Sequence, residues 1–529
     1  MSNHNLLHKT LLFAVCLMTH VAVWGQKVER TFTVGDIDYK LLNAYEVEVI
    51  GASFYVSQLQ IPTTVTATNW NNKTYTVTAI GNEAFYGCGS LTSINIGDSV
   101  TTIDIGAFTS CSKLTRITVS SNNTNYSSLN GVLFDKTQQR LILYPEGKIG
   151  EYQIPNSVTT IGDYAFSDCN KLTSINFPNS VKTIRNGAFM YCFGLTNINL
   201  SNSVTTIGDQ AFYHCSGLTN INIPNSVTTI GNEAFYQCSR LTNIDIPNSV
   251  TTIGDKAFYQ CSRLTNIDIP NSVTTIREGS FQNCTELTNI NIPNSVTTIG
   301  NEAFWGCSGL TNIDIPNSVT TIGCDAFHGC SKLTNINIPN SVTGIGYATF
   351  HGCSGLTNID IPNSVTTIGN EAFWGCSGLT NIDIPNSVTT IGDEAFWGCS
   401  GLTNINIGKS VTTIGYEAFN ECSNLRTLHF YPIYPPTINF GFGNCPNLQT
   451  IYVPQGAFYV YWSTPPFSNH FLYDIQEMDE PAGIGEVETT EAPQSGNIYD
   501  LNGRLVRTDG NLQALPKGIY ILNGKKVVR

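Results

Sequence analysis

Apolar residues return along most of the chain with a period of 23 residues. One unit, residues 215–238, reads CSGLTNINIPNSVTTIGNEAFYQC. Within it, Leu218 begins an apolar-x-x-apolar-x-apolar strand in which Ile221 and Ile223 alternate with polar residues, and the proline that follows cannot extend a strand ladder. The apolar residues of segment 230–238 share one face of a short helical turn, and Asn232 is placed to cap its free amides. Each unit therefore predicts one strand, one return and one helical turn.

A cysteine marks the same point of each unit, three residues after a phenylalanine. This column consists of Cys88, Cys111, Cys169, Cys192, Cys215, Cys238, Cys261, Cys284, Cys307, Cys330, Cys353, Cys376, Cys399, Cys422 and Cys445. A fixed period of this length is typical of a solenoid, in which each unit covers the apolar face of the next. The predicted fold is an α/β solenoid with a parallel β-sheet on one face and short helical turns on the other.

The repeated residues Leu-x-x-Ile-x-Ile-Pro and Val-x-x-Ile-Gly-x-x-Ala-Phe-x-x-Cys resemble the BspA-like class of bacterial leucine-rich repeats, from about residue 61 to 453. The resemblance implies a right-handed superhelix that is placed at the cell surface or secreted. It also implies adhesion to a protein partner, either host matrix or another bacterial surface.

The N-terminus departs from the period. Residues 1–25 combine a weakly basic start with an apolar run too short to cross a membrane, and we predict a secretory signal peptide. Residues 26–60 alternate as strands do and are expected to form a β cap over the first rung, because an open sheet edge promotes aggregation. The other expected parts are a solenoid over 61–430, hairpin insertions near 66–77 and 120–153, and a last repeat with a C-terminal cap over 431–476.

The C-terminus has its own composition. Residues 477–497 are acidic and contain proline and glycine, which predicts a flexible linker. Residues 498–529 alternate around Asn-Gly turns and predict a small β-domain of hairpins. Its Asp-Leu-Asn-Gly-Arg and Lys-Gly-Ile-Tyr-Ile elements resemble the C-terminal sorting domain of the type IX secretion pathway of Bacteroidetes, which implies export across the outer membrane. A β-module that merely caps the chain is the alternative.

Charge and motifs narrow the function. The chain carries 26 basic and 39 acidic residues, a net charge of −13, which argues against nucleic acid and against anionic membranes as partners. Beyond the first 25 residues no stretch approaches the 18 apolar residues of a membrane span. No Gly-x-Ser-x-Gly, His-Glu-x-x-His or phosphate-binding glycine loop is present, so neither an enzyme nor a cofactor is predicted.

The cysteine column could be read as a disulfide ladder, a metal ladder or a row of buried thiols. Stacked equivalent positions point their Cβ atoms in parallel, which is poor geometry for a disulfide. No Cys-x-x-Cys or Cys/His cluster indicates a metal. We therefore expect buried thiols that act as small apolar side chains. Cys324 stands where other units have a capping Asn or Asp, so it is expected to be exposed.

The residue after each core phenylalanine is aromatic in most units, and on a helical turn it would lie opposite the buried face. The candidate binding residues at this position are Tyr213, Tyr236, Tyr259, Trp305, His328, His351, Trp374 and Trp397, preceded by Tyr86. Exposed rings could stack on sugars or anchor a protein partner. The alternative is ring-on-ring packing with a structural role. The two histidines make a weak case for a metal.

The outward positions of the predicted sheet are polar. Asparagine fills one column, and the second mixes asparagine with the candidate binding residues Asp245, Asp268, Asp314, Asp360 and Asp383. Stacked amides can hydrogen-bond along the array, which is a structural role. The carboxylates could instead recruit a basic ligand or weakly bound Ca²⁺.

Three functions remain open from the sequence. The first is an exported surface protein that binds a protein partner as an adhesin does. The second is a solenoid that binds glycans through the Tyr/Trp column. The third is a surface spacer without a ligand of its own.

Overall fold

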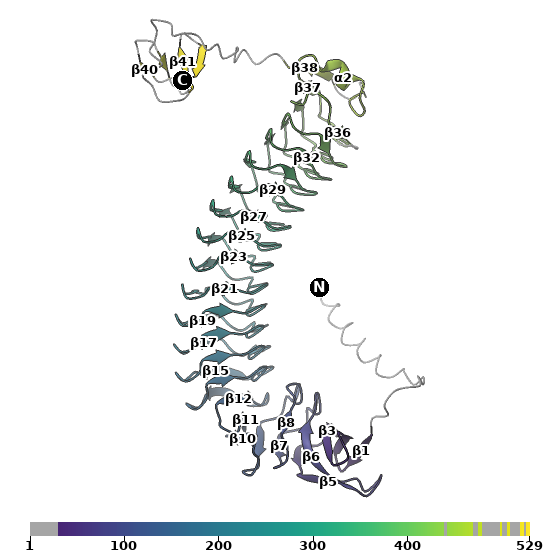
Figure 1. The fold of residues 1–529 in the computed structure, drawn as a ribbon, viewed down its shortest axis with the longest axis vertical. Helices are drawn as coiled ribbons and strands as arrows, with labels where there is room; N and C mark the ends of the chain where they lie inside the picture. The colour runs from purple at the N-terminus through teal and green to yellow at the C-terminus, as the bar shows by residue number, and fades with distance from the viewer. Residues whose placement is uncertain are drawn as a thin grey trace. The chain divides into compact units, whose positions relative to one another are not determined.

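The computed structural model describes residues 30–438, 442–468, 474–478, 498–499, 505–507, 519–522 and 525–528. The predicted signal peptide, most of the predicted linker and the two Asn-Gly turns near the C-terminus lie outside the described residues. The chain divides into two compact units, Met1–Gly150 with Pro155–Leu172, and Glu151–Ile154 with Thr173–Arg529. Figure 1 shows the order of the elements along the chain.

The first unit contains the irregular strands. Strands β1 (Thr31–Val34), β2 (Ile37–Leu41) and β3 (Glu46–Ala52) pair antiparallel, β5 (Thr64–Thr66) and β6 (Thr74–Ile80) form a hairpin, and β8 (Thr102–Ile103) joins β6. A parallel sheet contains β4 (Gln58–Ile61), β7 (Ser93–Ile96) and β9 (Arg116–Val119). Strands β10 (Tyr126–Leu129), β11 (Val132–Asp135) and β12 (Arg140–Leu143) form a meander, and β12 pairs in parallel with β14 (Thr160–Ile161).

The second unit is a parallel β-solenoid in which equivalent segments of successive repeats pair into short parallel sheets and isolated bridges, which we call together the asparagine ladder (Figure 1). Equivalent residues 23 positions apart pair in register, as Asn197 does with Asn220. The strands of this ladder are β13 (Gly150–Gln153), β15 (Leu172–Asn176), β17 (Asn197–Asn199), β19 (Asn220–Asn222), β22 (Asn266–Asp268), β24 (Asn289–Asn291), β26 (Asn312–Ile313), β28 (Asn335–Ile336), β31 (Asn381–Ile384), β33 (Asn404–Ile407), β35 (Thr427–Phe430), β37 (Thr450–Val453) and β38 (Asp474–Glu477).

A second ladder, the threonine ladder, runs along the same unit and was not predicted. It is built from two-residue strands, in which Thr206 pairs with Thr229 and Ile207 with Ile230. Its strands are β16 (Thr183–Ile184), β18 (Thr206–Ile207), β20 (Thr229–Ile230), β21 (Thr252–Ile253), β23 (Thr275–Ile276), β25 (Thr298–Ile299), β27 (Thr321–Ile322), β29 (Gly344–Ile345), β30 (Thr367–Ile368), β32 (Thr390–Ile391), β34 (Thr413–Ile414) and β36 (Thr437–Ile438).

The predicted solenoid with its parallel sheet is confirmed. The third side of each repeat, the turn side, follows the threonine ladder, as segment 231–238 does. It consists of non-helical turns instead of the predicted helical turn. Glu233 and Gln237 have φ values of 54° and 56°, which a right-handed helix cannot contain. Amides that a helix would use internally point instead to the next rung. The Glu233 and Gln237 N–H groups donate to the carbonyls of Asp255 at 2.8 Å and Tyr259 at 2.7 Å.

The side chain that was predicted to cap the turn, Asn232, forms its hydrogen bonds with neighbouring rungs instead. The Asn232 side chain does not cap its own turn, because its Oδ1 accepts the backbone N–H of Asp255, one repeat later, at 2.9 Å. The Asn232 N–H donates in turn to Oδ1 of Asp209, one repeat earlier, at 2.8 Å. These side chains therefore link the units along the array.

Phenylalanine and cysteine columns fill the core between these three sides. Phe235 and Phe258 stack with centroids 5.4 Å apart and planes 3° apart, and both are fully buried. The cysteines of the column are free and buried, except for half-buried Cys445, which confirms the predicted row of thiols. The Cys238 thiol donates to the Phe212 carbonyl at 3.2 Å, and this contact recurs along the array.

Shorter elements follow the last rungs. Helix α2 (Phe458–Trp462) precedes β38, and Tyr461 of this helix is buried with its hydroxyl donating to the Pro432 carbonyl at 2.8 Å. Near the C-terminus, β39 (Ile498–Tyr499), β40 (Leu505–Arg507), β41 (Ile519–Leu522) and β42 (Lys525–Val528) form an antiparallel sheet in the order β40-β39-β41-β42. Among the described residues, no helix has the length and apolar character needed to cross a membrane.

Candidate binding surfaces

The asparagine ladder presents a polar face to solvent. All five candidate aspartates, Asp245, Asp268, Asp314, Asp360 and Asp383, are exposed on it. Each β-ladder neighbour is an asparagine or another aspartate, and at Asp383 the carboxylate accepts a hydrogen bond from the Asn406 side chain. The described residues contain no group of three His, Cys, Asp or Glu side chains arranged to hold a metal ion. The five carboxylates are thus exposed on the polar face without such a group.

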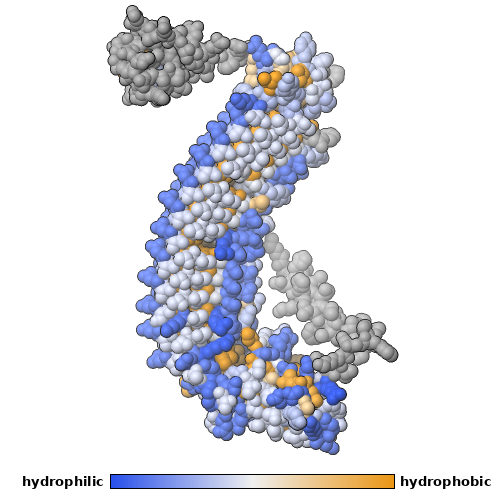
Figure 2. Space-filling view, viewed as in Figure 1, coloured by the Kyte–Doolittle hydropathy of each residue, from blue (hydrophilic) through white to orange (hydrophobic). Residues whose placement is uncertain are grey.

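Threonines border this polar face and tie its rungs together. The Thr219 hydroxyl donates to the Thr196 carbonyl of the preceding rung at 2.9 Å, and Thr403 bonds Thr380 in the same way at 3.1 Å. The threonine side chains thus bind the backbone of the preceding rung. On the side shown in Figure 2, hydrophilic residues and residues of intermediate hydropathy cover most of the repeat array, while hydrophobic ones appear as a narrow line.

The candidate aromatic residues lie on the turn side at one repeat position, which we call the aromatic column and which is interrupted at Gln282. It consists of Tyr213, Tyr236, Tyr259, Trp305, His328, His351, Trp374 and Trp397, all half-buried. Tyr236 stacks on Tyr259 with a centroid distance of 4.3 Å, and Trp374 on Trp397 at 4.7 Å, both with planes 7° apart. Within these stacks the rings cover one another's faces and leave mainly their edges to solvent, which agrees with the alternative of ring-on-ring packing rather than with open rings.

Acidic residues stand three positions before five of the eight rings, and Glu417 has the same position before Asn420; from the sequence they suit the turn but were not expected to line a surface. This acidic column consists of Glu233, Glu302, Asp325, Glu371, Glu394 and Glu417. Burial raises the pKa of Glu394, and the neighbouring carboxylates of Glu371 and Glu417 raise it further. The constant offset from the rings was the signal that could have revealed the column, because turn residues three apart lie on the same side of the rung.

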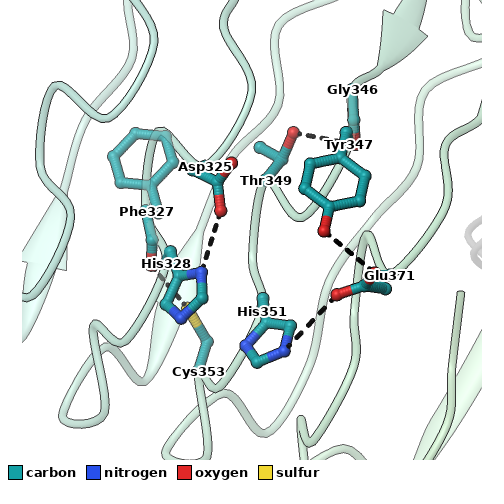
Figure 3. Close-up of polar contacts among 9 residues, drawn as sticks. All are labelled: Asp325, Phe327, His328, Gly346, Tyr347, Thr349, His351, Cys353 and Glu371. Atoms are coloured by element: carbon teal, nitrogen blue, oxygen red, sulfur yellow. Dashed lines mark hydrogen bonds and ion pairs between the residues drawn. The ribbon is translucent and has the colours of Figure 1, made fainter.

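Two histidines form the centre of the aromatic column (Figure 3). His328 and His351 stack with centroids 4.2 Å apart, and His351 stacks on Trp374 at 4.3 Å. His328 Nδ1 lies 2.9 Å from Asp325 Oδ1, while the Glu371 carboxylate accepts a 2.9 Å bond from the Tyr347 hydroxyl and lies 3.8 Å from His351 Nε2. Burial, and then the charge of His328, lower the pKa of His351. The pair is therefore held as part of the stack and gives no support to a metal site.

Residues 63–146, 142–264, 228–357 and 343–469 match the BspA type leucine rich repeat region, in six copies. These matches cover most of the described chain. The chain belongs to the BspA-type leucine-rich repeat family. Leucine-rich repeat proteins typically serve as non-enzymatic binding scaffolds, which agrees with the absence of catalytic motifs from the sequence.

Solved structures of other bacterial leucine-rich repeat proteins are similar to this BspA-type chain. A leucine-rich repeat protein from Bacteroides ovatus ATCC 8483 is 33% identical, covers 76% of this chain and 94% of its own length, and has a TM-score of 0.53. A leucine rich cell surface protein from Faecalibacterium prausnitzii A2-165 is 29% identical over 72% of this chain and 95% of its own, with a TM-score of 0.43. No match was found among curated proteins.

Cys324 interrupts the row of Asn and Asp side chains in this BspA-type solenoid. It is exposed, as expected, and its backbone N–H donates to Asn301 Oδ1 at 3.0 Å. In other repeats the residue at this position accepts the amide of the following rung, as Asp393 accepts that of Tyr416 at 2.7 Å. A thiol is a weak acceptor, so this junction is held mainly by its backbone hydrogen bonds.

Proposed function

We propose that this chain is an exported surface protein that binds a protein partner on host matrix or on another bacterium, as an adhesin does. The observation that carries the proposal is the geometry of the aromatic column. A sugar that stacks on a ring needs an open ring face, whereas within the stacks Tyr213–Tyr259 and His328–Trp397 neighbouring rings occupy these faces at 4.2–4.7 Å. Ring edges beside carboxylates suit a protein interface instead, in which Tyr and Trp are common anchors and the polar rim supplies hydrogen bonds.

The binding surface can be tested on the purified chain. Replacing both Trp374 and Trp397 by alanine is expected to weaken binding to immobilised matrix proteins or bacterial cells by at least tenfold, because buried aromatic anchors dominate interface energies. Surface plasmon resonance gives the affinity, and a circular-dichroism melt checks that the array remains folded.

The matched control lies on the other face of the same repeats. Asp360→Asn with Asp383→Asn is expected to leave that affinity within about twofold if the aromatic column is the anchor. Glycan-array binding that disappears with the tryptophans would favour a glycan-binding solenoid. Intact surface display without any binding would leave a spacer.

Export to the surface is part of the same proposal. It is supported by the apolar stretch at the N-terminus, by the surface placement of BspA-like proteins and by the antiparallel sheet of β39–β42, which suits a small sorting domain. Deleting Ile498–Arg529 is expected to abolish surface display while the repeat array accumulates inside the cell. Protease shaving of whole cells measures display, and unchanged display of the truncated chain would exclude a sorting role.

A further inference from the structure

The repeat that contains Gly279 and Gln282 differs from its neighbours at these two positions of the turn side. Gly279 stands in the acidic column between Lys256 and Glu302, and Gln282 stands in the aromatic column between Tyr259 and Trp305. The stacked tyrosines therefore end at Tyr259, and the next ring is two rungs away, about 10 Å at the usual strand spacing. The break divides the aromatic column into a tyrosine part and a Trp/His part.

A polar pocket of about 310 Å³ opens at this break. It is lined by Tyr213, Glu233, Tyr236, Lys256, Tyr259, Gln282 and Glu302. A Cβ on Gly279 would lie 3.1 Å from Gln282 Oε1 and 2.9 Å from Lys256 Cγ, so a side chain here would occupy the space above the amide. The missing side chain thus keeps the pocket open.

The pocket contains a buried acceptor. Gln282 is only 5% exposed, and within the described part of the chain its Oε1 atom has no hydrogen-bond donor. A buried polar atom left unsatisfied costs about 1–3 kcal/mol, which a donor supplied from outside would recover. The preferred occupant is therefore a group that donates hydrogen bonds.

The charges at the pocket are mainly negative. Glu233 and Glu302 line it, and the one lining cation, Lys256, is drawn to Glu278 at 3.3 Å. Glu233 accepts a bond from the Gln210 amide at 2.8 Å, which fixes its carboxylate beside the tyrosines. A cation that enters between Lys256 and Glu302 would meet the Glu302 carboxylate, the Gln282 oxygen and the ring of Tyr259, while Glu233 lies three rungs, about 14 Å, from Glu302 along the same side.

We propose that this pocket binds the guanidinium group of an arginine side chain presented by a protein partner. A guanidinium is planar, always charged, carries five donors and no acceptor, and packs against aromatic rings. It thus matches an unpaired acceptor that lies between the Glu302 carboxylate and the Tyr259 ring. A lysine ammonium lacks the planar fork, and citrulline has the shape without the charge. The inference rests on the proposed binding of a protein partner and names the side chain that the partner supplies.

The probe is N-acetyl-arginine amide, compared with its lysine and citrulline counterparts on the full chain. Saturation-transfer NMR and tyrosine fluorescence should show the arginine compound binding at least fivefold more tightly than either of the others. Gln282→Leu keeps the volume and removes the acceptor, and Gly279→Glu restores the residue common in this column. Both are expected to reduce arginine binding at least fivefold. The matched control Glu417→Gln, far along the same column, should leave it unchanged.

Two results would overturn the assignment: equal binding of citrulline and arginine, or unchanged arginine binding in both Gln282→Leu and Gly279→Glu. Thermal melts of these variants separate a lost site from a lost fold. The proposed function fails separately, because absent binding to matrix proteins and bacterial cells would refute adhesion even if the arginine compound still binds. Partner binding that persists in Gln282→Leu would instead leave adhesion standing and remove this pocket from it.

Discussion

Replacing Phe304 by alanine is expected to destabilise the array by about 3–5 kcal/mol, because it empties a fully packed position. Phe304 is completely buried and stacks between Phe281 and Phe327, with centroids 5.6 and 5.4 Å away. The neighbours are held by hydrogen bonds on all three sides of the rung and cannot collapse into the cavity. Urea unfolding followed by circular dichroism gives the change.

The control for this substitution is an aromatic residue outside the core. Tyr434 is 76% exposed, so Tyr434→Ala is expected to change the free energy of unfolding by less than about 0.5 kcal/mol. Because units of a solenoid interact mainly with their neighbours, the loss at Phe304 should appear first as local opening around its own rung. Hydrogen exchange confined to the chain ends, with none near Phe304, would contradict this picture.

The second large effect concerns thiol reactivity. Burial raises the pKa of Cys307 and Cys353 to about 12, which leaves roughly one thiolate in 10⁴ at pH 8. Exposed Cys324 should therefore react with Ellman's reagent within seconds to minutes, half-buried Cys445 more slowly, and the rest of the column only after unfolding. Absorbance at the nitrothiobenzoate band, read before and after adding guanidinium chloride, counts the thiols in each class.

Cys324→Ser provides the check on the assignment of the fast phase. This variant should lose the fast phase and keep the guanidinium-dependent one. Several fast thiols in the folded chain, or a fast phase that survives the substitution, would mean that the column is not sealed. If unfolding without a reductant releases fewer reactive thiols than the chain has cysteines, some of the cysteines form disulfides.

The sequence was sufficient for the main sheet and the core because their residues alternate with unmistakable spacing. Ile221 and Ile223 alternate with asparagines at the period of a strand, and a 23-residue period leaves only equivalent positions to pair. The cysteines were assigned correctly from geometry alone, since parallel Cβ directions do not suit disulfides. These features depend on the backbone repeat and hardly on side-chain torsions.

The remaining features depend on information that a single repeat does not contain. A two-residue strand such as Thr229–Ile230 is too short to show alternation, so the threonine ladder was missed. Glu233 and Gln237 adopt positive φ although neither residue type favours it, and the helical spacing of their neighbours was misleading. Whether the rings of the aromatic column face solvent or each other depends on χ angles that the period does not fix.

Because repeats pair in register, the length of the repeat array can change only by whole repeats. Each unit contacts its neighbours through residues they share, and segments 303–312, 372–381 and 395–404 contain the same ten residues in the same order. Losing or duplicating one repeat between such segments brings together repeat surfaces that already pack against each other elsewhere in the array. It changes the length of the array by one rung, about 4.8 Å. Recombination within the gene could therefore adjust the distance between the two chain ends without designing a new interface.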